Sequence, residues 1–189
     1  MKLTISIKIF LLVSFFLLFS NLELTGQEAR LENIIVTNTN DDLLINLNVE
    51  GAFTDKMKSA VLSGVPITFS FFIDLFKARN YWADKKIVEQ KITHSMKYHT
   101  LKKEFLIQRS WESGKSITTG SFTEAQQLMT QINGLRIIQL NELIKGSQYQ
   151  IRIKAELAKK TLPLYLHYVI FFIALWDFET DWYTIDFIY

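Results

Sequence analysis

The clearest indication of the architecture is the segment Ile67-Thr68-Phe69-Ser70-Phe71-Phe72-Ile73-Asp74-Leu75-Phe76. Its odd-numbered residues are all apolar, whereas its even-numbered residues mix threonine, serine and aspartate with two phenylalanines. Because successive side chains of a strand point to opposite faces, this pattern predicts a long strand that is buried on its odd face and partly covered on its even face. The backbone of such a strand needs hydrogen-bonding partners, so the rest of the chain is expected to supply neighbouring strands.

Segments before and after residues 67–76 repeat this alternation. Turn-forming residues at 38–42 join two of these segments in a hairpin, and His99-Thr100 is predicted to make the tight turn of a longer hairpin. The predicted strands cover residues 31–36, 43–49, 87–98, 101–109, 135–140, 149–157 and 183–189. Connections this short join antiparallel strands, because a parallel crossover needs a dozen or more residues.

Two short helices are expected between the strands. Thr54 is predicted to cap the first helix, which is expected to end at Gly64 before Pro66. Residues 121–124 (Ser-Phe-Thr-Glu) form a capping box that starts the second helix, and Asn133-Gly134 is predicted to close it.

The pattern as a whole is mainly β and predicts an antiparallel β-sandwich in the immunoglobulin-like size class with two short helices. A partly open barrel is the alternative. Two prolines and seven glycines leave no room for a long flexible linker, so residues 30–189 are interpreted as a single domain.

The N-terminal residues 1–26 have the features of a secretory signal peptide. Lys2 and Lys8 precede the apolar stretch 9–19, and polar residues resume at Ser20. An uncut N-terminal anchor is the alternative, and contact with the membrane is expected only through that segment. The sequence has no cysteine, which excludes a lipid tether and disulfides. These features predict an exported bacterial protein in the periplasm or on the outer face of the inner membrane.

The formal net charge of the chain is only +2. Proteins that bind nucleic acids through the phosphate backbone carry a clear surplus of positive charge. We therefore predict no nucleic-acid partner.

An ordered series of short motifs runs through the chain. Its members are Gly64-Val65-Pro66, Tyr81-Trp82-Ala83-Asp84, His94 with Tyr98 and Leu101, Gly146 with Tyr149, Leu162-Pro163, and Trp176-Asp177-Phe178-Glu179-Thr180-Asp181-Trp182-Tyr183. In this series the chain resembles a family of exported bacterial proteins known only as a domain of unknown function, DUF4390. The resemblance implies an envelope location and genes that often lie near sensor histidine kinases of the nitrogen-regulation type. It carries over no catalytic or binding residues.

Asp177, Glu179 and Asp181 form an acidic ladder near the C-terminus. On a strand, alternate side chains share a face at successive separations of about 6.5–7 Å. Paired carboxylates at this spacing fit glycoside hydrolysis or a calcium site. The alternative is that the acids bond to local backbone amides and pair with lysine or arginine.

Other residue types give no catalytic, cofactor or metal site. His94 lies on the apolar side of its predicted strand, which favours a core histidine with satisfied ring nitrogens over a metal ligand. Gly114-Lys115-Ser116 has the form of the end of a phosphate-binding loop, but Arg109 occupies the position where the first glycine is needed. No catalytic residue, cofactor or metal is therefore predicted.

The apolar run at residues 165–176 leaves three alternatives open. It forms a buried strand pair, a segment in contact with lipid, or a surface that docks a partner. As a helix it would extend only about 18 Å, too short for a bilayer core of about 30 Å.

Two functional hypotheses follow. The first is a non-enzymatic protein-interaction or sensory accessory module of the envelope, whose partner is an envelope protein such as a sensor kinase. The candidate interaction surface comprises Trp82, Asp84, Trp176, Asp177, Glu179, Asp181 and Trp182. The second is a carbohydrate-binding or hydrolytic protein that uses the same tryptophans for stacking and the acids for hydrogen bonding or chemistry.

Overall fold

Strand β3 (Ile67–Lys77) lies inside an antiparallel sheet with a partner strand on each edge. Strand β4 (Lys85–His99) pairs with one edge and strand β8 (Gln148–Leu157) with the other. Four odd-numbered side chains of β3, at positions 69, 71, 73 and 75, are fully buried, which confirms the predicted inner face. The structure is a computed structural model that describes residues 29–79, 81–112, 114–158 and 178–189.

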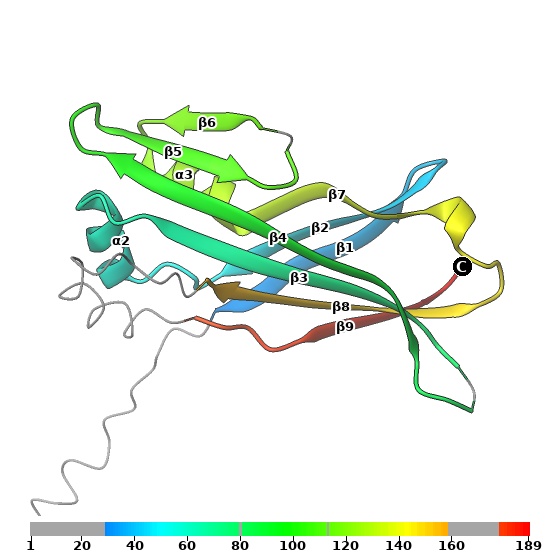
Figure 1. The fold of residues 1–189 in the computed structure, drawn as a ribbon. Coiled ribbons are helices and arrows are strands. Elements are labelled where there is room, and N and C mark those ends of the chain that lie inside the picture. The colour runs from blue at the N-terminus through cyan, green and yellow to red at the C-terminus, as the bar shows by residue number, and fades with distance from the viewer. Residues whose placement is uncertain (1–28, 80, 113, 159–177) are drawn as a thin grey trace, which may run out of the picture.

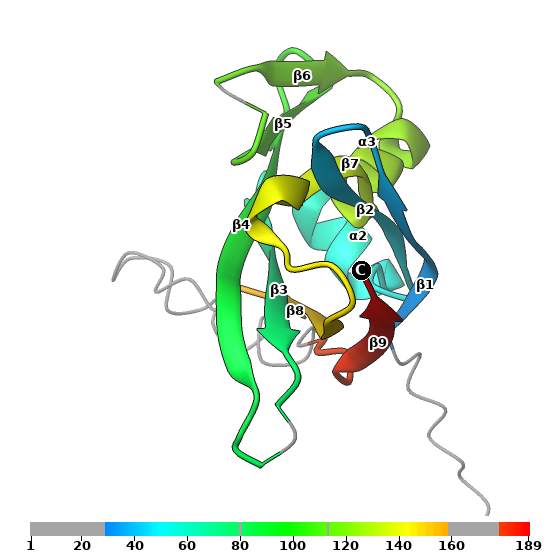
Figure 2. The same ribbon diagram turned by 90° about the vertical axis from the view of Figure 1, so that its right-hand side faces the viewer.

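Two antiparallel sheets face each other across the core (Figures 1 and 2). The strand order is β6-β5-β4-β3-β8-β9 in the larger sheet and β1-β2-β7 in the smaller one. The remaining strands are β1 (Arg30–Asn38), β2 (Asp42–Glu50), β5 (Glu104–Arg109), β6 (Ser116–Thr119), β7 (Gln131–Gln139) and β9 (Tyr183–Ile188). No strand of the described residues belongs to both sheets, so the fold is the predicted sandwich and not the partly open barrel.

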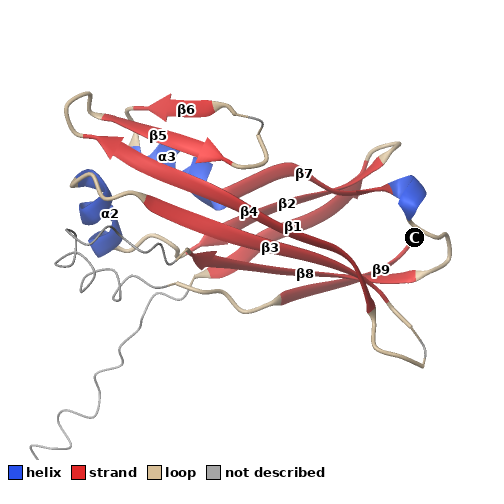
Figure 3. Cartoon of the chain, in the orientation of Figure 1, coloured by secondary structure: helices blue, strands red, loops and turns tan. Residues whose placement is uncertain are grey.

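Two short α-helices lie at one end of the sandwich, and a 3-10 helix, η1 (Leu140–Glu142), lies at the other (Figure 3). Helix α2 (Asp55–Leu62) begins as predicted, because the Thr54 hydroxyl accepts a hydrogen bond from the Met57 amide at 3.2 Å. Beyond its end, Gly64 has a φ of +89°, the left-handed conformation that glycine adopts most easily. Among the helices of the described residues, none has the length and apolar character needed to cross a membrane.

Helix α3 (Phe122–Thr130) begins at the predicted cap, with one difference in the hydrogen bonds. The Ser121 hydroxyl accepts from the Glu124 amide, as expected. The Glu124 carboxylate, however, accepts from the Thr119 hydroxyl, and the oxygen of that hydroxyl accepts from the Ser121 amide at 3.0 Å. In a capping box the glutamate carboxylate accepts directly from the backbone amide of the capping serine, whereas here the Thr119 hydroxyl lies between the two groups.

The prediction that Asn133-Gly134 closes this helix was wrong. The helix ends at Thr130, whose hydroxyl donates to the Gln126 carbonyl at 3.1 Å, and the next residue is already extended. Gly134 instead lies in a bulge of β7 with a φ of +71°, and its amide donates to Asn46 Oδ1 at 2.7 Å. A helix end and a bulge both use a left-handed glycine, so local sequence did not distinguish them.

The long hairpin formed by β4 and β5 has a wider turn than predicted. His99 pairs with Glu104, so the turn covers residues 100–103 and not His99-Thr100. Lys103 takes the left-handed conformation with a φ of +56°. A two-residue turn favours asparagine or glycine at its centre, and neither His99 nor Thr100 offers that freedom.

Candidate functional site

The outer face of the larger sheet carries aromatic rings covered by cations. This cation–aromatic face consists of Phe72, Phe76, Lys86, Lys91, Arg152, Lys154 and Trp182. Lys91 Nζ lies 4.7 Å from the centroid of the Phe72 ring. The Arg152 guanidinium carbon lies 4.4 Å from the centroid of the Phe76 ring, and Lys86 Nζ lies 5.5 Å from it. Each contact is within the range of a cation–π interaction.

The register of the sheet explains this arrangement. Phe72 is opposite Lys91 on β4 and Lys154 on β8, because all three occupy outward positions of paired strands. Two residues further along β3, Asp74 is opposite Arg152 and forms an ion pair of 2.9 Å with Lys86. The hydrogen bond to Asp74 raises the pKa of Lys86 above its ordinary value. Aromatic, acidic and basic side chains therefore alternate along the face.

The C-terminal motif adds Trp182 to the same face. Lys154 Nζ lies 5.7 Å from the Trp182 ring and also pairs with the Glu179 carboxylate. The Phe72 and Trp182 ring centroids are 6.5 Å apart. Phe178 points the other way, into the core, where its ring lies 4.7 Å from that of Phe69.

Backbone contacts with β8 fix the position of this motif before β9 begins. The Thr180 amide donates to the Ala155 carbonyl at 2.9 Å, and the Thr180 hydroxyl accepts from the Ala155 amide at 3.0 Å. The Leu157 amide donates to the Phe178 carbonyl at 3.0 Å. Because Thr180 and Phe178 are buried, Glu179 between them is directed outward.

The loop between β3 and β4 brings a second predicted residue to the face. Asp84 Oδ2 lies 4.0 Å from the Arg152 guanidinium, and its other oxygen accepts from the Arg79 amide at 3.3 Å. Trp82 lies in the same loop with 80% of its surface exposed.

The structure therefore gathers three of the seven predicted residues, Asp84, Glu179 and Trp182, around Arg152 and Lys154. Trp82 and Asp181 are exposed, and no contact of either side chain with this cluster is observed in the described residues. The other two, Trp176 and Asp177, lie outside the described residues, as do the apolar run 165–176 and the predicted leader 1–26.

Sequence reasoning did not select the four residues that hold this cluster together. They are Phe72, Phe76, Arg152 and Lys154. A signal was present, because two phenylalanines occupy the polar side of the alternation in residues 67–76. Bulky rings on an outward face need a cover, and long basic side chains on the neighbouring strands supply it.

Of the two acidic-ladder residues that the structure describes, Glu179 forms the ion pair with a basic residue that was the alternative to a catalytic or calcium-binding role. Glu179 pairs with Lys154, and Asp181 is exposed. Neither residue lines the two pockets described below. Within the described residues, no cluster of three or more histidine, aspartate or glutamate side chains has the arrangement needed to hold a metal ion.

Residues 26–186 match a family model described as "Domain of unknown function (DUF4390)". The chain belongs to the DUF4390 family. Comparison with curated proteins and with solved structures gave no match. The matched region contains both α-helices, every strand except the last two residues of β9, and all residues of the cation–aromatic face. The family description assigns no activity, so the functional interpretation of this DUF4390 domain rests on its geometry.

A buried histidine joins the larger sheet to α3 in this DUF4390 domain. His94 Nδ1 lies 3.0 Å from the Met129 carbonyl oxygen, so this nitrogen carries the hydrogen. His94 Nε2 accepts from the Trp111 indole N–H at 3.0 Å. Burial, assisted by the charge of nearby Arg109, lowers the pKa of His94 to about 4. The prediction of a core histidine with both ring nitrogens satisfied is confirmed.

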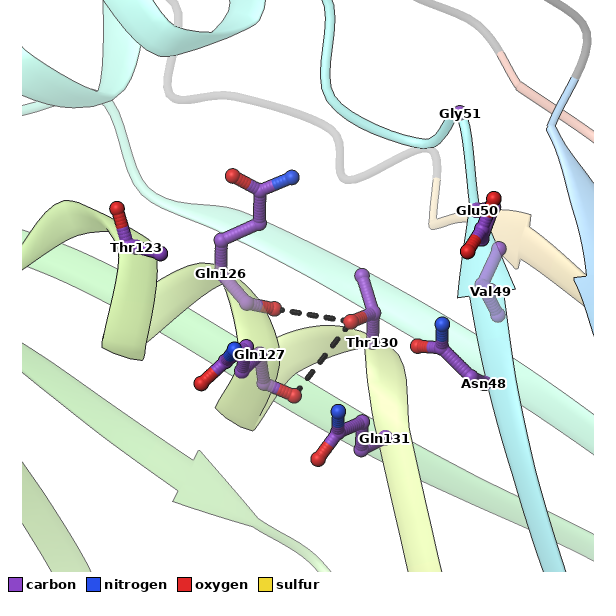
Figure 4. Close-up of a pocket in the computed structure, with 9 residues that line it drawn as sticks. All are labelled: Asn48, Val49, Glu50, Gly51, Thr123, Gln126, Gln127, Thr130 and Gln131. Atoms are coloured by element: carbon purple, nitrogen blue, oxygen red, sulfur yellow. Dashed lines mark hydrogen bonds between the residues drawn. The ribbon is translucent and has the colours of Figure 1, made fainter. Parts of the chain in front are cut away.

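A polar pocket of about 370 Å³ lies between the end of β2 and α3 (Figure 4). Its lining residues are Asn48, Val49, Glu50, Gly51, Thr123, Gln126, Gln127, Thr130 and Gln131. Asn48 Oδ1 is buried and has no hydrogen-bond partner among the described residues. The pocket thus presents amide and hydroxyl groups with only one carboxylate, a lining suited to a neutral ligand rich in hydroxyl or amide groups.

A second pocket, of about 320 Å³, lies over the β4–β5–β6 region and includes the Gly114-Lys115-Ser116 motif. Its lining includes Arg109, but this guanidinium already donates to Glu112 at 2.8 Å and to the Leu128 carbonyl at 3.0 Å. The arginine therefore serves to hold α3 on the sheet.

Proposed function

We propose that this DUF4390 protein is a non-enzymatic module of the bacterial cell envelope that binds a protein partner through its cation–aromatic face. The observation that carries the proposal is the set of aromatic and basic side chains around Trp182 and Arg152 on the outer face of the larger sheet. Tryptophan and arginine are the residue types enriched among the side chains that dominate binding energy at protein interfaces.

The arrangement of these side chains favours recognition. Trp182 is 48% exposed, and Lys154, which contacts its ring, is held by Glu179. Side chains that are already ordered lose less conformational entropy when a partner binds, so more of the contact energy appears as affinity. Neighbouring acids such as Asp84 and Glu179 supply the polar rim that surrounds such anchors in interfaces.

The proposed location is outside the cytoplasmic membrane, in the periplasm or on the outer face of the inner membrane. The apolar segment 9–19 behind Lys2 and Lys8 supports export. The proposed partner is an envelope protein, and the extracytoplasmic part of a sensor kinase is the first candidate to test.

Site-specific photo-cross-linking in the native host tests the proposal. A benzophenone amino acid replaces Trp182 in the full chain, and a matched control places it at Ile35, an exposed residue on the smaller sheet. We expect one specific envelope protein to be captured from position 182 and to be lost when Arg152→Ala is added. Equal capture from both positions, or none from position 182, would contradict the proposal.

Carbohydrate binding is the second candidate function, and the polar pocket favours it. Gln126, Gln127 and Gln131 line the same pocket as Asn48, whose buried oxygen has no partner among the described residues, and each amide both donates and accepts hydrogen bonds as sugar hydroxyls do. The acids of the C-terminal motif lie outside this pocket, so the proposal is binding without hydrolysis.

Side-chain amide signals in an NMR titration with glucose or N-acetylglucosamine test this second function. Binding should shift the signals of Gln126, Gln127 and Gln131, and Gln127→Leu should weaken it about fivefold, the value of one lost hydrogen bond. The matched control is Gln139→Leu, an exposed glutamine near the other end of β7. Unchanged signals with both sugars would rule this function out.

A further inference from the structure

Among the described residues, the sandwich has four edge strands, which differ in how well they are protected from pairing with another chain. At one edge, β1 contains a bulge between Glu32 and Ile35, and Asn33 there has a φ of +51°. At two others, β7 has two register shifts and β6 has only four residues. Bulges and short strands are the usual devices that prevent edge-to-edge association.

The fourth edge, β9, lacks these devices. It pairs with β8 over six residues without a register shift and contains neither lysine nor proline. Tyr183 is 47% exposed and Ile188 is 76% exposed. In the described part of the chain, no strand pairs with its outer edge, which lies at the border of the sheet (Figure 1). An edge without bulges, lysine or proline is a template for strand addition.

The hydrogen bonds at the end of β9 show which residues face that edge. The Tyr189 amide donates to the Ser147 carbonyl, so odd-numbered residues direct their backbone groups toward β8. In antiparallel pairing these roles alternate along the strand. The backbone groups of Thr184, Asp186 and Ile188 therefore point toward the open edge.

We propose that the open edge of β9 pairs antiparallel with β9 of a second copy of this chain, about a two-fold axis at Ile185. The larger sheets of the two copies then form one continuous sheet. This inference is independent of the cation–aromatic face as a partner site, although Trp182 lies at the margin of both. An isologous contact of this kind closes on itself and gives a dimer.

The sequence of β9 is self-complementary in this register. Around Ile185, Thr184 of one copy is opposite Asp186 of the other, where the hydroxyl can donate to the carboxylate. Tyr183 is opposite Phe187, and Trp182 is opposite Ile188, so exposed apolar groups cover one another.

Neighbouring registers are less favourable. An axis at Asp186 places the two Asp186 carboxylates directly opposite each other, which is destabilising. An axis between two residues places inward side chains opposite outward ones. The self-complementary pairing is what favours a second copy over an unrelated strand as the occupant of the edge.

Single-cysteine variants of the full chain test the register, because the sequence contains no cysteine. In the proposed dimer the two Ile185 residues form a pair without mutual backbone hydrogen bonds, with a Cα separation of about 4.5 Å that permits a disulfide. Ile185→Cys should therefore cross-link to a covalent dimer with the oxidant diamide. Thr184→Cys should not cross-link, because the two Thr184 residues are two positions out of alignment.

Analytical ultracentrifugation of the full chain in mild detergent tests the association itself. The wild type should dimerise, and Thr184→Pro should weaken the dimer by more than about tenfold, because it removes one edge hydrogen bond from each copy. This substitution leaves the pairing of β9 with β8 intact, so at a protein concentration where both proteins are monomeric the thermal unfolding midpoint should be nearly unchanged. A monomeric wild type, or equal cross-linking of both cysteine variants, would overturn the proposal.

Discussion

Phe71 and Phe72 are neighbours in sequence but lie on opposite faces of β3. Phe71 is fully buried between the sheets, where its ring lies 4.8 Å from that of His94. Phe72 lies on the outer face beneath Lys91 and is only partly buried. The comparison separates two faces of one strand: its inner face packs in the core of the sandwich, and its outer face carries the cation–aromatic side chains proposed as a partner site.

The largest expected effect is on the inner face. Phe71→Ala should lower the free energy of unfolding by about 3–5 kcal/mol, because it removes a buried ring and leaves a cavity. Phe72→Ala should cost only about 1–2 kcal/mol, because the lost area is partly exposed in the folded protein. Urea denaturation of both variants measures the difference. Equal losses would show that the outer face is as important for stability as the core.

The second-largest expected effect is a loss of folding stability at low pH, caused by His94 on the inner face. The pKa of His94 falls from an ordinary value of 6.5 to about 4 in the folded protein. Between these values the unfolded chain binds a proton that the folded chain does not, so stability is lost as the pH falls from 6.5 to 4. The loss approaches about 3 kcal/mol at the lower end.

The charged groups nearest His94 are Arg109, which opposes protonation, and Glu112, which favours it. The measurement is the free energy of unfolding as a function of pH for the wild type and His94→Gln. Carboxylates titrate in both proteins, so the difference between the two curves isolates the histidine. A difference that stays constant from pH 7 to about pH 4 would show that His94 does not titrate in this range.

The faces of β3 were predictable because alternation is a local property of the sequence. Thr54 and Ser121 were predictable for the same reason, since a cap and the amide that it binds lie within three residues. Gly134 was not, because its role depends on Asn46, which lies 88 positions away in the chain. A glycine in the left-handed conformation marks the interruption of a regular element, and tertiary contacts determine whether that interruption is a helix end or a β-bulge.

The candidate site was predicted only in part, because some of its contacts join residues that are distant in the sequence. Trp182 and Glu179 stand out in the sequence as parts of a dense motif. Their partner Lys154 does not, because it is one of several basic residues on the polar side of β8 and lies 25 positions from Glu179. The sequence therefore indicated Trp182 and Glu179, whereas the strand register, which places Lys154 beside them, became evident only in the structure.

The smallest expected effect tests whether the cations on the outer face interact with the rings or only cover them. In a double-mutant cycle, Lys91→Met keeps the apolar stem and Phe72→Leu keeps an apolar side chain, so the coupling reports the charge over the ring. We expect a coupling of about 0.5–1 kcal/mol by urea denaturation. The matched cycle combines Lys91→Met with Phe76→Leu, whose ring contacts Lys86 and Arg152 instead. That coupling should be near zero, and equal values in the two cycles would mean that the face is a general apolar cover without specific cation–ring pairs.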